Sequence, residues 1–231
     1  GMLFNIIYWI FGFLRMGTSG MTSQAYGQHD LNEINRLLIR SVGVGLFIAL
    51  CLLILQYPIL NAAFTLIQTT EEVKQLATTY FYICIWGAPA MLGLYGFAGW
   101  FIGMQNSRFP MYIAITQNIV NIIASLSFVY LLDMKVAGVA AGTLIAQYAG
   151  FFMAILLYMR YYSTLRKRIV WKDIIQKQAM YRFFRVNRDI FFRTFCLVIV
   201  TMFFTSAGAA QGEVVLAVNT LLMQLFTLFS Y

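Results

Sequence analysis

Polar side chains inside one long apolar stretch are the residues of this sequence best placed to do chemistry. The stretch 111–132 contains Gln117, Asn118, Asn121 and Ser125. Residues four apart lie on one face of a helix, so Gln117, Asn121 and Ser125 form a polar stripe. Amide and hydroxyl groups at membrane depth are costly and face protein or a wet cavity. The residues by themselves leave two interpretations open: hydrogen-bonded contact with a neighbouring helix, or the lining of a polar cavity.

The next apolar stretch carries a second polar pair, Thr143 and Gln147, one turn apart. It opens with Gly138 and Gly142, and small residues four apart permit close contact between membrane helices. Gly99 with Gly103 repeats this spacing in the preceding part of the chain. The glycines therefore predict tightly packed helices that would hold the polar residues in place.

A proline and several large residues complete the set of candidates. Pro89 lacks a backbone donor and predicts a kink in its helix. Arg15 lies within an apolar stretch, and its charge is explained either by snorkelling to the interface or by a substrate cleft. The aromatic candidates for lining such a cleft are Tyr80, Tyr95 and Trp100.

Catalytic and metal-binding patterns are missing from the sequence. No apolar stretch contains a pair of carboxylates, and there is no Ser/His/Asp set and no phosphate-binding glycine loop. The three cysteines stand singly, without the spacing of a disulfide framework or a zinc site. We therefore predict that the protein is not an enzyme and binds neither a metal nor an organic cofactor.

The elements that must position these residues are membrane helices. Hydrophobic residues make up 61% of the chain and charged residues only 10%, against about 25% charged residues in ordinary globular domains. A helix that crosses the bilayer needs roughly 20 apolar residues, and lipid favours helices because they close their own hydrogen bonds. Seven stretches qualify: Leu3–Ala25, Leu37–Ala63, Leu76–Met104, Met111–Leu132, Val136–Tyr158, Ile190–Ala210 and Val214–Tyr231. We predict an all-α polytopic membrane helix bundle, and a chain truncated at both ends with a helix missing before the first stretch.

Positive charges gather after alternate stretches and predict the orientation. Arg36 and Arg40 follow the first stretch, Arg108 follows the third, and a long basic segment follows the fifth. By the positive-inside rule these three connections are cytoplasmic, which predicts a multi-pass protein of the inner (plasma) membrane. The net charge of +8 is explained by these loops and does not indicate nucleic-acid binding.

The basic segment divides the chain into three parts. We predict a first lobe at 1–158, a cytoplasmic linker at 159–189 and the start of a second lobe at 190–231. Within the linker, apolar residues spaced for an interfacial amphipathic helix could bring its cations to anionic lipids. These apolar residues are Ile169, Trp171, Ile174 and Ile175.

Five stretches of the sequence resemble, in order, the multidrug and toxic compound extrusion (MATE) family, and its DinF-like branch in particular. The longest is FLRMGTSGMTSQAYG at 13–27; the others are GMQNSRFP at 103–110, NIVNI at 118–122, GVAAGT at 138–143 and NRDIFFRT at 187–194. The resemblance implies two six-helix lobes around a central cleft, with this chain running from the second helix to part of the eighth. It also implies export of cationic or amphipathic organic compounds by alternating access, in exchange for protons or sodium ions.

The resemblance carries family roles to individual residues. Asn121 matches a coupling Asn and Thr143 a coupling Thr, whereas Ser125 stands where an Asp is expected, and a serine carries no titrating charge near neutral pH. Asn118, Gln117 and Gln147 are weaker members of the predicted polar cluster. Two other functions stay open: a lipid-linked precursor flippase of the same superfamily, and a non-transporting membrane scaffold.

Overall fold

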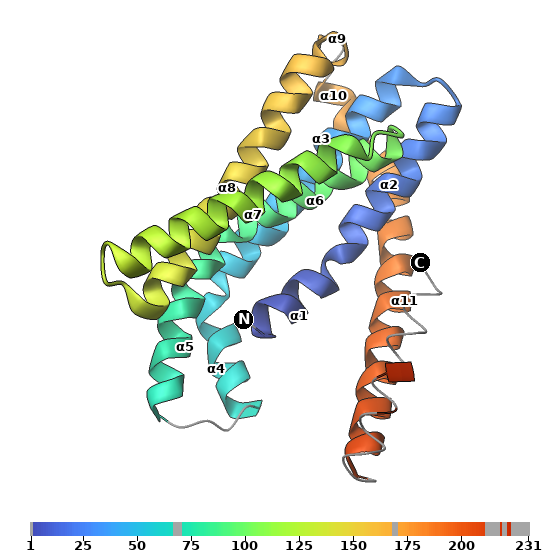
Figure 1. The fold of residues 1–231 in the computed structure, drawn as a ribbon. Coiled ribbons are helices and arrows are strands. Elements are labelled where there is room, and N and C mark those ends of the chain that lie inside the picture. The colour runs from blue at the N-terminus through green and yellow to red at the C-terminus, as the bar shows by residue number, and fades with distance from the viewer. Residues whose placement is uncertain (1, 67–70, 168–170, 211–217, 219–220, 223–231) are drawn as a thin grey trace. The chain divides into compact units, whose positions relative to one another are not determined.

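The computed structural model describes residues 2–66, 71–167, 171–210, 218 and 221–222. Every regular element in these residues is helical: α1 Met2–Ile10, α2 Gly12–Gly27, α3 Leu31–Ile54, α4 Gln56–Leu66, α5 Glu71–Cys84, the 3₁₀ helix η1 Ile85–Gly87, α6 Ala88–Gly103, α7 Arg108–Tyr130, α8 Lys135–Tyr161, α9 Ser163–Arg166, α10 Trp171–Ile174 and α11 Lys177–Ala210 (Figure 1). The all-α prediction is confirmed. Most of the predicted stretch Val214–Tyr231 lies outside the described residues.

Four helical spans in the described part of the chain are long and apolar enough to cross a membrane: Leu31–Ile54, Lys74–Gly103, Arg108–Tyr130 and Lys135–Tyr161. They correspond to the second to fifth predicted stretches. The first predicted stretch is helical too, but a break at Phe11 divides it into α1 and α2. The sixth lies within α11, which begins at Lys177, well before the predicted start at Ile190.

The chain divides into two compact units, Gly1–Asn187 and Arg188–Tyr231, with the division inside α11. Residues 177–187 of the expected linker therefore form the first part of α11 and belong to the first unit. Of the predicted interfacial helix the structure describes α10, Trp171–Ile174, which ends before Ile175. Ile174 is buried in the first unit while Ile175 is exposed, and Ile169 lies outside the described residues.

The structure interrupts the helix next to Pro89, where a kink was predicted. A single 3₁₀ turn, η1, separates α5 from α6, and Pro89 occupies the first turn of α6. Proline is tolerated there because the first helical N–H groups have no partner within the helix. The break brings Gly87 against the side chain of Gln147 on α8.

The helix α6 forms the centre of the first unit, and glycines set its contacts. A Cβ atom on Gly99 would collide with the backbone of Arg15 on α2, and one on Gly103 would lie 2.5 Å from Thr22 Cβ. On the α3 side, a Cβ on Gly96 would meet Ser41 and Val42. The close packing predicted from the spacing of Gly99 and Gly103 is therefore confirmed.

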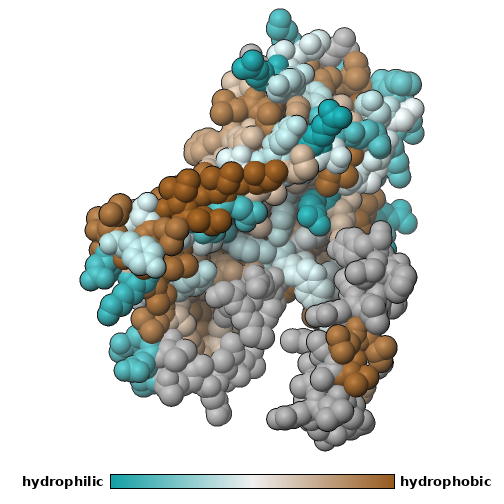
Figure 2. All heavy atoms as spheres, viewed as in Figure 1, coloured by the Kyte–Doolittle hydropathy of each residue, from teal (hydrophilic) through white to brown (hydrophobic). Residues whose placement is uncertain are grey.

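The helix α7 lies along α8 and exposes most of its surface (Figure 1). Its large exposed apolar side chains include Met111, Tyr112, Ile115, Ile119, Ile122, Ile123 and Leu126. Figure 2 shows these as a continuous apolar run of the surface along α7. Such a surface suits contact with lipid.

Candidate functional site

The polar stripe on α7 faces α8. Ser125 Oγ donates to Asn121 Oδ1 at 3.0 Å, so these two side chains form one hydrogen-bonded pair. A Cβ on Gly142 would collide with Ser125, and a Cβ on Gly150 would lie 2.5 Å from the side chain of Gln117. The small residues of α8 thus make room for the stripe. Its weaker neighbour Asn118 is exposed on another face.

The pair on α8 faces a different set of helices. Thr143 donates its hydroxyl to Val139 O of its own helix at 3.0 Å and lies close to Tyr80 of α5. Gln147 packs against Gly87. Among the described residues no hydrogen bond joins this pair to the stripe on α7. Five of the six predicted residues therefore form two groups on two sides of α8, and Asn118 belongs to neither.

Among the described residues of the first unit, five buried polar side-chain atoms have no hydrogen-bond partner of adequate geometry. Two of them belong to neighbouring side chains: the hydroxyl of Tyr8 on α1 and Oε1 of Gln147. The other three are on Thr22, Gln56 and Asn187. Buried polar atoms without partners are rare and call for an explanation such as an unseen ion, water or ligand. Sequence analysis missed Tyr8, because a lone tyrosine in an apolar stretch resembles an interfacial aromatic.

The four residues predicted to line a cleft fall in different places. Arg15 is exposed, and its guanidinium lies within electrostatic range of the half-buried Tyr95; among the described residues it forms no ion pair. Tyr80 is half-buried beside Thr143. Trp100 does not line a cleft: it is 0% exposed in the core and donates its Nε1–H to Ile34 O at 2.8 Å. That carbonyl gives the indole N–H a partner, which allows it to be buried.

Metal binding has no support in the part of the chain that the structure describes. No group of three or more His, Cys, Asp or Glu side chains there is close enough together to hold a metal ion. Cys51, Cys84 and Cys196 are free thiols. The polar residues above can donate and accept hydrogen bonds and can ligate a small cation through oxygen, but they offer no nucleophile with an activating base.

Comparisons with known proteins give similarities over the whole chain. Residues 1–126 match the sequence model of the MatE family. The chain is 32% identical over 236 residues to DNA damage-inducible protein F of Escherichia coli (strain K12), which covers 98% of this chain and 50% of that protein. It is 26% identical over 198 residues to Protein DETOXIFICATION 45, chloroplastic, of Arabidopsis thaliana. This match covers 85% of this chain and 34% of that protein.

A solved structure agrees with these sequence matches. The outward-facing conformation of a multidrug resistance MATE family transporter of the MOP superfamily superposes with a TM-score of 0.80 at 21% identity, over 99% of this chain and 51% of that one. At this identity the likeness concerns the fold. The chain spans half or less of the length of the relatives it matches.

Proposed function

The chain belongs to the MatE family of multi-pass membrane transporters, and from this premise we propose that the whole protein is a secondary active transporter that exports organic compounds in exchange for protons or sodium ions. The resemblance in the five sequence motifs is thereby confirmed at the level of the family. Members of this family are transporters and not enzymes. In this proposal the substrate is a cationic or amphipathic small molecule that crosses the plasma membrane by alternating access.

The observation that carries the proposal is the polar interior of the first unit. Tyr8 and Gln147 keep buried polar atoms without partners, next to a helix break of the kind that marks binding sites in many transporters. We propose that Asn121 and Thr143 help to bind the coupling ion, with Ser125, Gln117, Asn118 and Gln147 in support. Since Ser125 has no titrating charge, the acid that couples a proton must then come from a residue other than those six.

The proposed topology follows the charges. In the first unit, hydrogen bonds join the start of α3 to Leu165 and Ile174, and Asn106 to Tyr162, so the three basic connections lie at one end. Figure 1 shows α9, α10 and the turn between α2 and α3 at that end. We propose that this basic end is cytoplasmic, with the linker 159–189 between two lobes and in contact with anionic lipid headgroups.

The coupling role of Asn121 and Thr143 is tested by ion-driven efflux in the full-length protein. We expect Asn121→Ala and Thr143→Val each to slow efflux about tenfold or more, because a lost hydrogen bond to a charged ligand costs about 1.5–3 kcal/mol. Thr116→Val is the matched control, since Thr116, like Thr143, donates to the carbonyl four residues earlier, at 2.9 Å, but lies on α7 outside the polar group. If Asn121→Ala transports as fast as the wild type, its role is structural only.

Arg15 gives a second prediction, about which substrates are accepted. Cα–Cβ bonds tilt toward the helix N-terminus, so the side chain of Arg15 leans toward α1 and away from the basic end of the unit, which opposes snorkelling to that end. A charge at membrane depth requires a wet cavity or a partner. We therefore propose that Arg15 faces the substrate path and selects, among amphipathic compounds, those with an acidic group.

For Arg15→Gln we expect the KM of an acidic amphiphile to rise about tenfold, through loss of a charge-assisted hydrogen bond. The KM of a permanent cation should stay the same or fall. Competition assays in proteoliposomes measure both, with Arg182→Gln at an exposed position as the control. Equal changes for the two substrates would contradict this assignment of Arg15.

A further inference from the structure

A set of side chains near the start of α3 holds the segment that follows α8. We name this set the clasp: Glu33, Asn35, Arg36 and Arg40 on α3, with Leu165, Asp173 and Ile174 as their partners. Arg40 donates through Nε to Ile174 O at 2.8 Å and through Nη2 to Asp173 O at 3.0 Å. Its Nη1 forms an ion pair with Glu33 at 2.8 Å, and only 1% of the Arg40 side chain is exposed.

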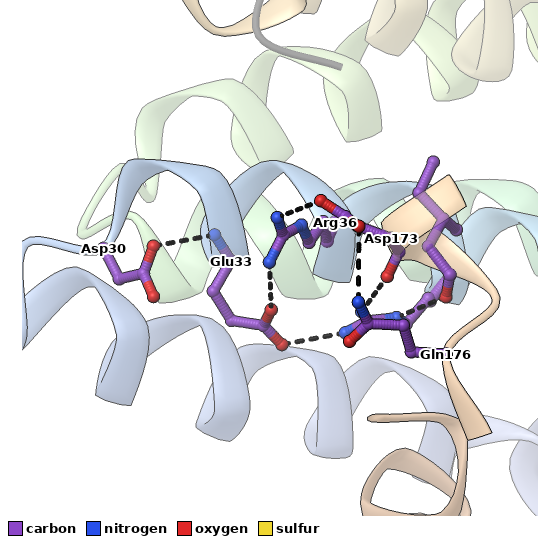
Figure 3. Close-up of polar contacts among 7 residues, drawn as sticks. Asp30, Glu33, Arg36, Asp173 and Gln176 are labelled. Atoms are coloured by element: carbon purple, nitrogen blue, oxygen red, sulfur yellow. Dashed lines mark hydrogen bonds and ion pairs between the residues drawn. The ribbon is translucent and has the colours of Figure 1, made fainter. Parts of the chain in front are cut away.

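Ion pairs at the rim of the clasp extend these contacts (Figure 3). Arg36 Nη2 lies 2.6 Å from Asp173 Oδ2, and Gln176 Nε2 donates to Asp173 Oδ1 at 3.3 Å. Asp30 accepts the backbone N–H of Glu33 at 3.0 Å and so caps α3. The start of α3 is therefore fixed by its own cap while it binds the partner segment.

The third part of the clasp is buried and uncharged. Asn35 Nδ2 donates to Leu165 O at 2.9 Å, and Tyr158 donates its hydroxyl to Asn35 Oδ1 at 2.6 Å. The side chains of Leu165 and Ile174 are buried. Together with Arg40, these contacts fasten α9 and α10 to α3.

Burial makes attachment of the segment all-or-none. Arg40 has five N–H donors and no acceptor, and two of the atoms that satisfy it are backbone carbonyls at the end of α10, where a helix leaves carbonyls without partners. Leaving a buried guanidinium partly unpaired is strongly unfavourable. The segment therefore has one well-defined attached state, and detaching it exposes Arg40, Leu165 and Ile174 together.

The attachment continues into α11. Phe183 is fully buried in the core of the first unit, and Asn187 packs against Gly17 of α2. Residues 163–167 and 171–187 thus form one arm fastened to the first unit, and the second unit begins at Arg188 in the same helix.

We propose that the clasp couples the two units mechanically: Arg36 and Arg40 keep the arm attached to α3. Motion of the second unit is then transmitted through α11 to the first unit, which a flexible linker would not do. This inference rests on the proposed function, since it assigns the clasp a role in alternating access. It predicts that loosening the clasp slows the turnover of substrate without changing its binding.

The test uses the full-length protein in nanodiscs, with hydrogen exchange of residues 163–167 and 171–176 and transport measured side by side. We expect Arg40→Gln and the milder Asp173→Asn to speed exchange of this segment at least tenfold while exchange in α7 stays unchanged. kcat should fall with KM unchanged. Asp189→Asn is the matched control, because Asp189 is exposed and pairs only with its neighbour Arg188 in the described residues.

A charge exchange keeps the test independent of folding losses. Arg36→Asp alone and Asp173→Arg alone should each loosen the segment, and the double variant should restore slow exchange and turnover. Unchanged exchange in Arg40→Gln and Asp173→Asn would overturn the clasp, and faster exchange with wild-type kcat would overturn its coupling role. If the wild type transports nothing, the proposed function fails, whereas the exchange data still decide whether the clasp holds the arm.

Discussion

Gly99→Ala is expected to destabilise the protein even though alanine is the better helix former. A Cβ atom there would collide with the carbonyl oxygen of Arg15 and lie 3.1 Å from its carbonyl carbon. Both belong to the backbone of α2, so no side-chain rotation relieves the clash and α2 must move away from α6. Overpacking of this kind costs about 1–3 kcal/mol, which should lower the melting temperature of the purified protein in detergent.

The control for this prediction is Gly20→Ala on α2. A Cβ on Gly20 would meet nothing within 4 Å, and replacing glycine by alanine inside an open helix stabilises by about 1 kcal/mol. The two substitutions are chemically identical and should shift the melting temperature in opposite directions. A rise in both variants would show that α2 and α6 do not meet at Gly99.

Trp100→Ala is expected to lower stability by about 3 kcal/mol, near the low end for large aromatic residues in cores. The low end applies because lipid is as apolar as the protein interior, so the loss comes from packing and from the hydrogen bond to Ile34 O. The indole packs edge to face on Tyr158 and Tyr162, with ring centroids 5.6 and 4.9 Å away. Equilibrium unfolding in mixed micelles measures the change.

Trp86→Ala supplies the comparison for this prediction. Trp86 lies on η1 with 55% of its surface exposed, and substitutions at such positions change stability by about 0.5 kcal/mol or less. Trp100→Phe keeps an aromatic ring but loses the N–H donor, so its stability should lie between the wild type and Trp100→Ala. If Trp100→Ala and Trp86→Ala unfold alike, Trp100 is not a core residue.

The helices of this protein could be predicted because their cause is local. A long run of apolar residues in lipid must satisfy its backbone hydrogen bonds within itself. A proline disturbs such a helix because it lacks a backbone N–H, and Pro89 does so here. The start of α11 was predicted too late, at Ile190 and not Lys177, because the basic residues of 177–189 hid a helix that continues into the apolar part. Its burial depends on contacts such as Phe183, which no local pattern reveals.

The polar site was only partly predictable for the same reason. The four-residue spacing of Gln117, Asn121 and Ser125 correctly placed these side chains on one face of α7. The spacing could not predict that these side chains pack against small residues of α8. It also could not predict that the side chain of Gln147 lies beside Tyr8. Trp100 was predicted to line a cleft, but it is buried in the core. The carbonyl of Ile34 accepts the indole N–H there, which no local pattern could predict.

The sequence by itself determined the all-helical fold, the interruption at Pro89, the membrane environment and the family, because each follows from residues that are neighbours in the chain or from motifs read in order. The breaks at Phe11 and Leu55 were not predicted. Only the tertiary structure decided which polar faces meet and that Arg40 binds the backbone of Asp173 and Ile174. The Arg40 contacts join residues more than a hundred positions apart in the sequence. Their energy depends on burial, and burial exists only once the helices have packed.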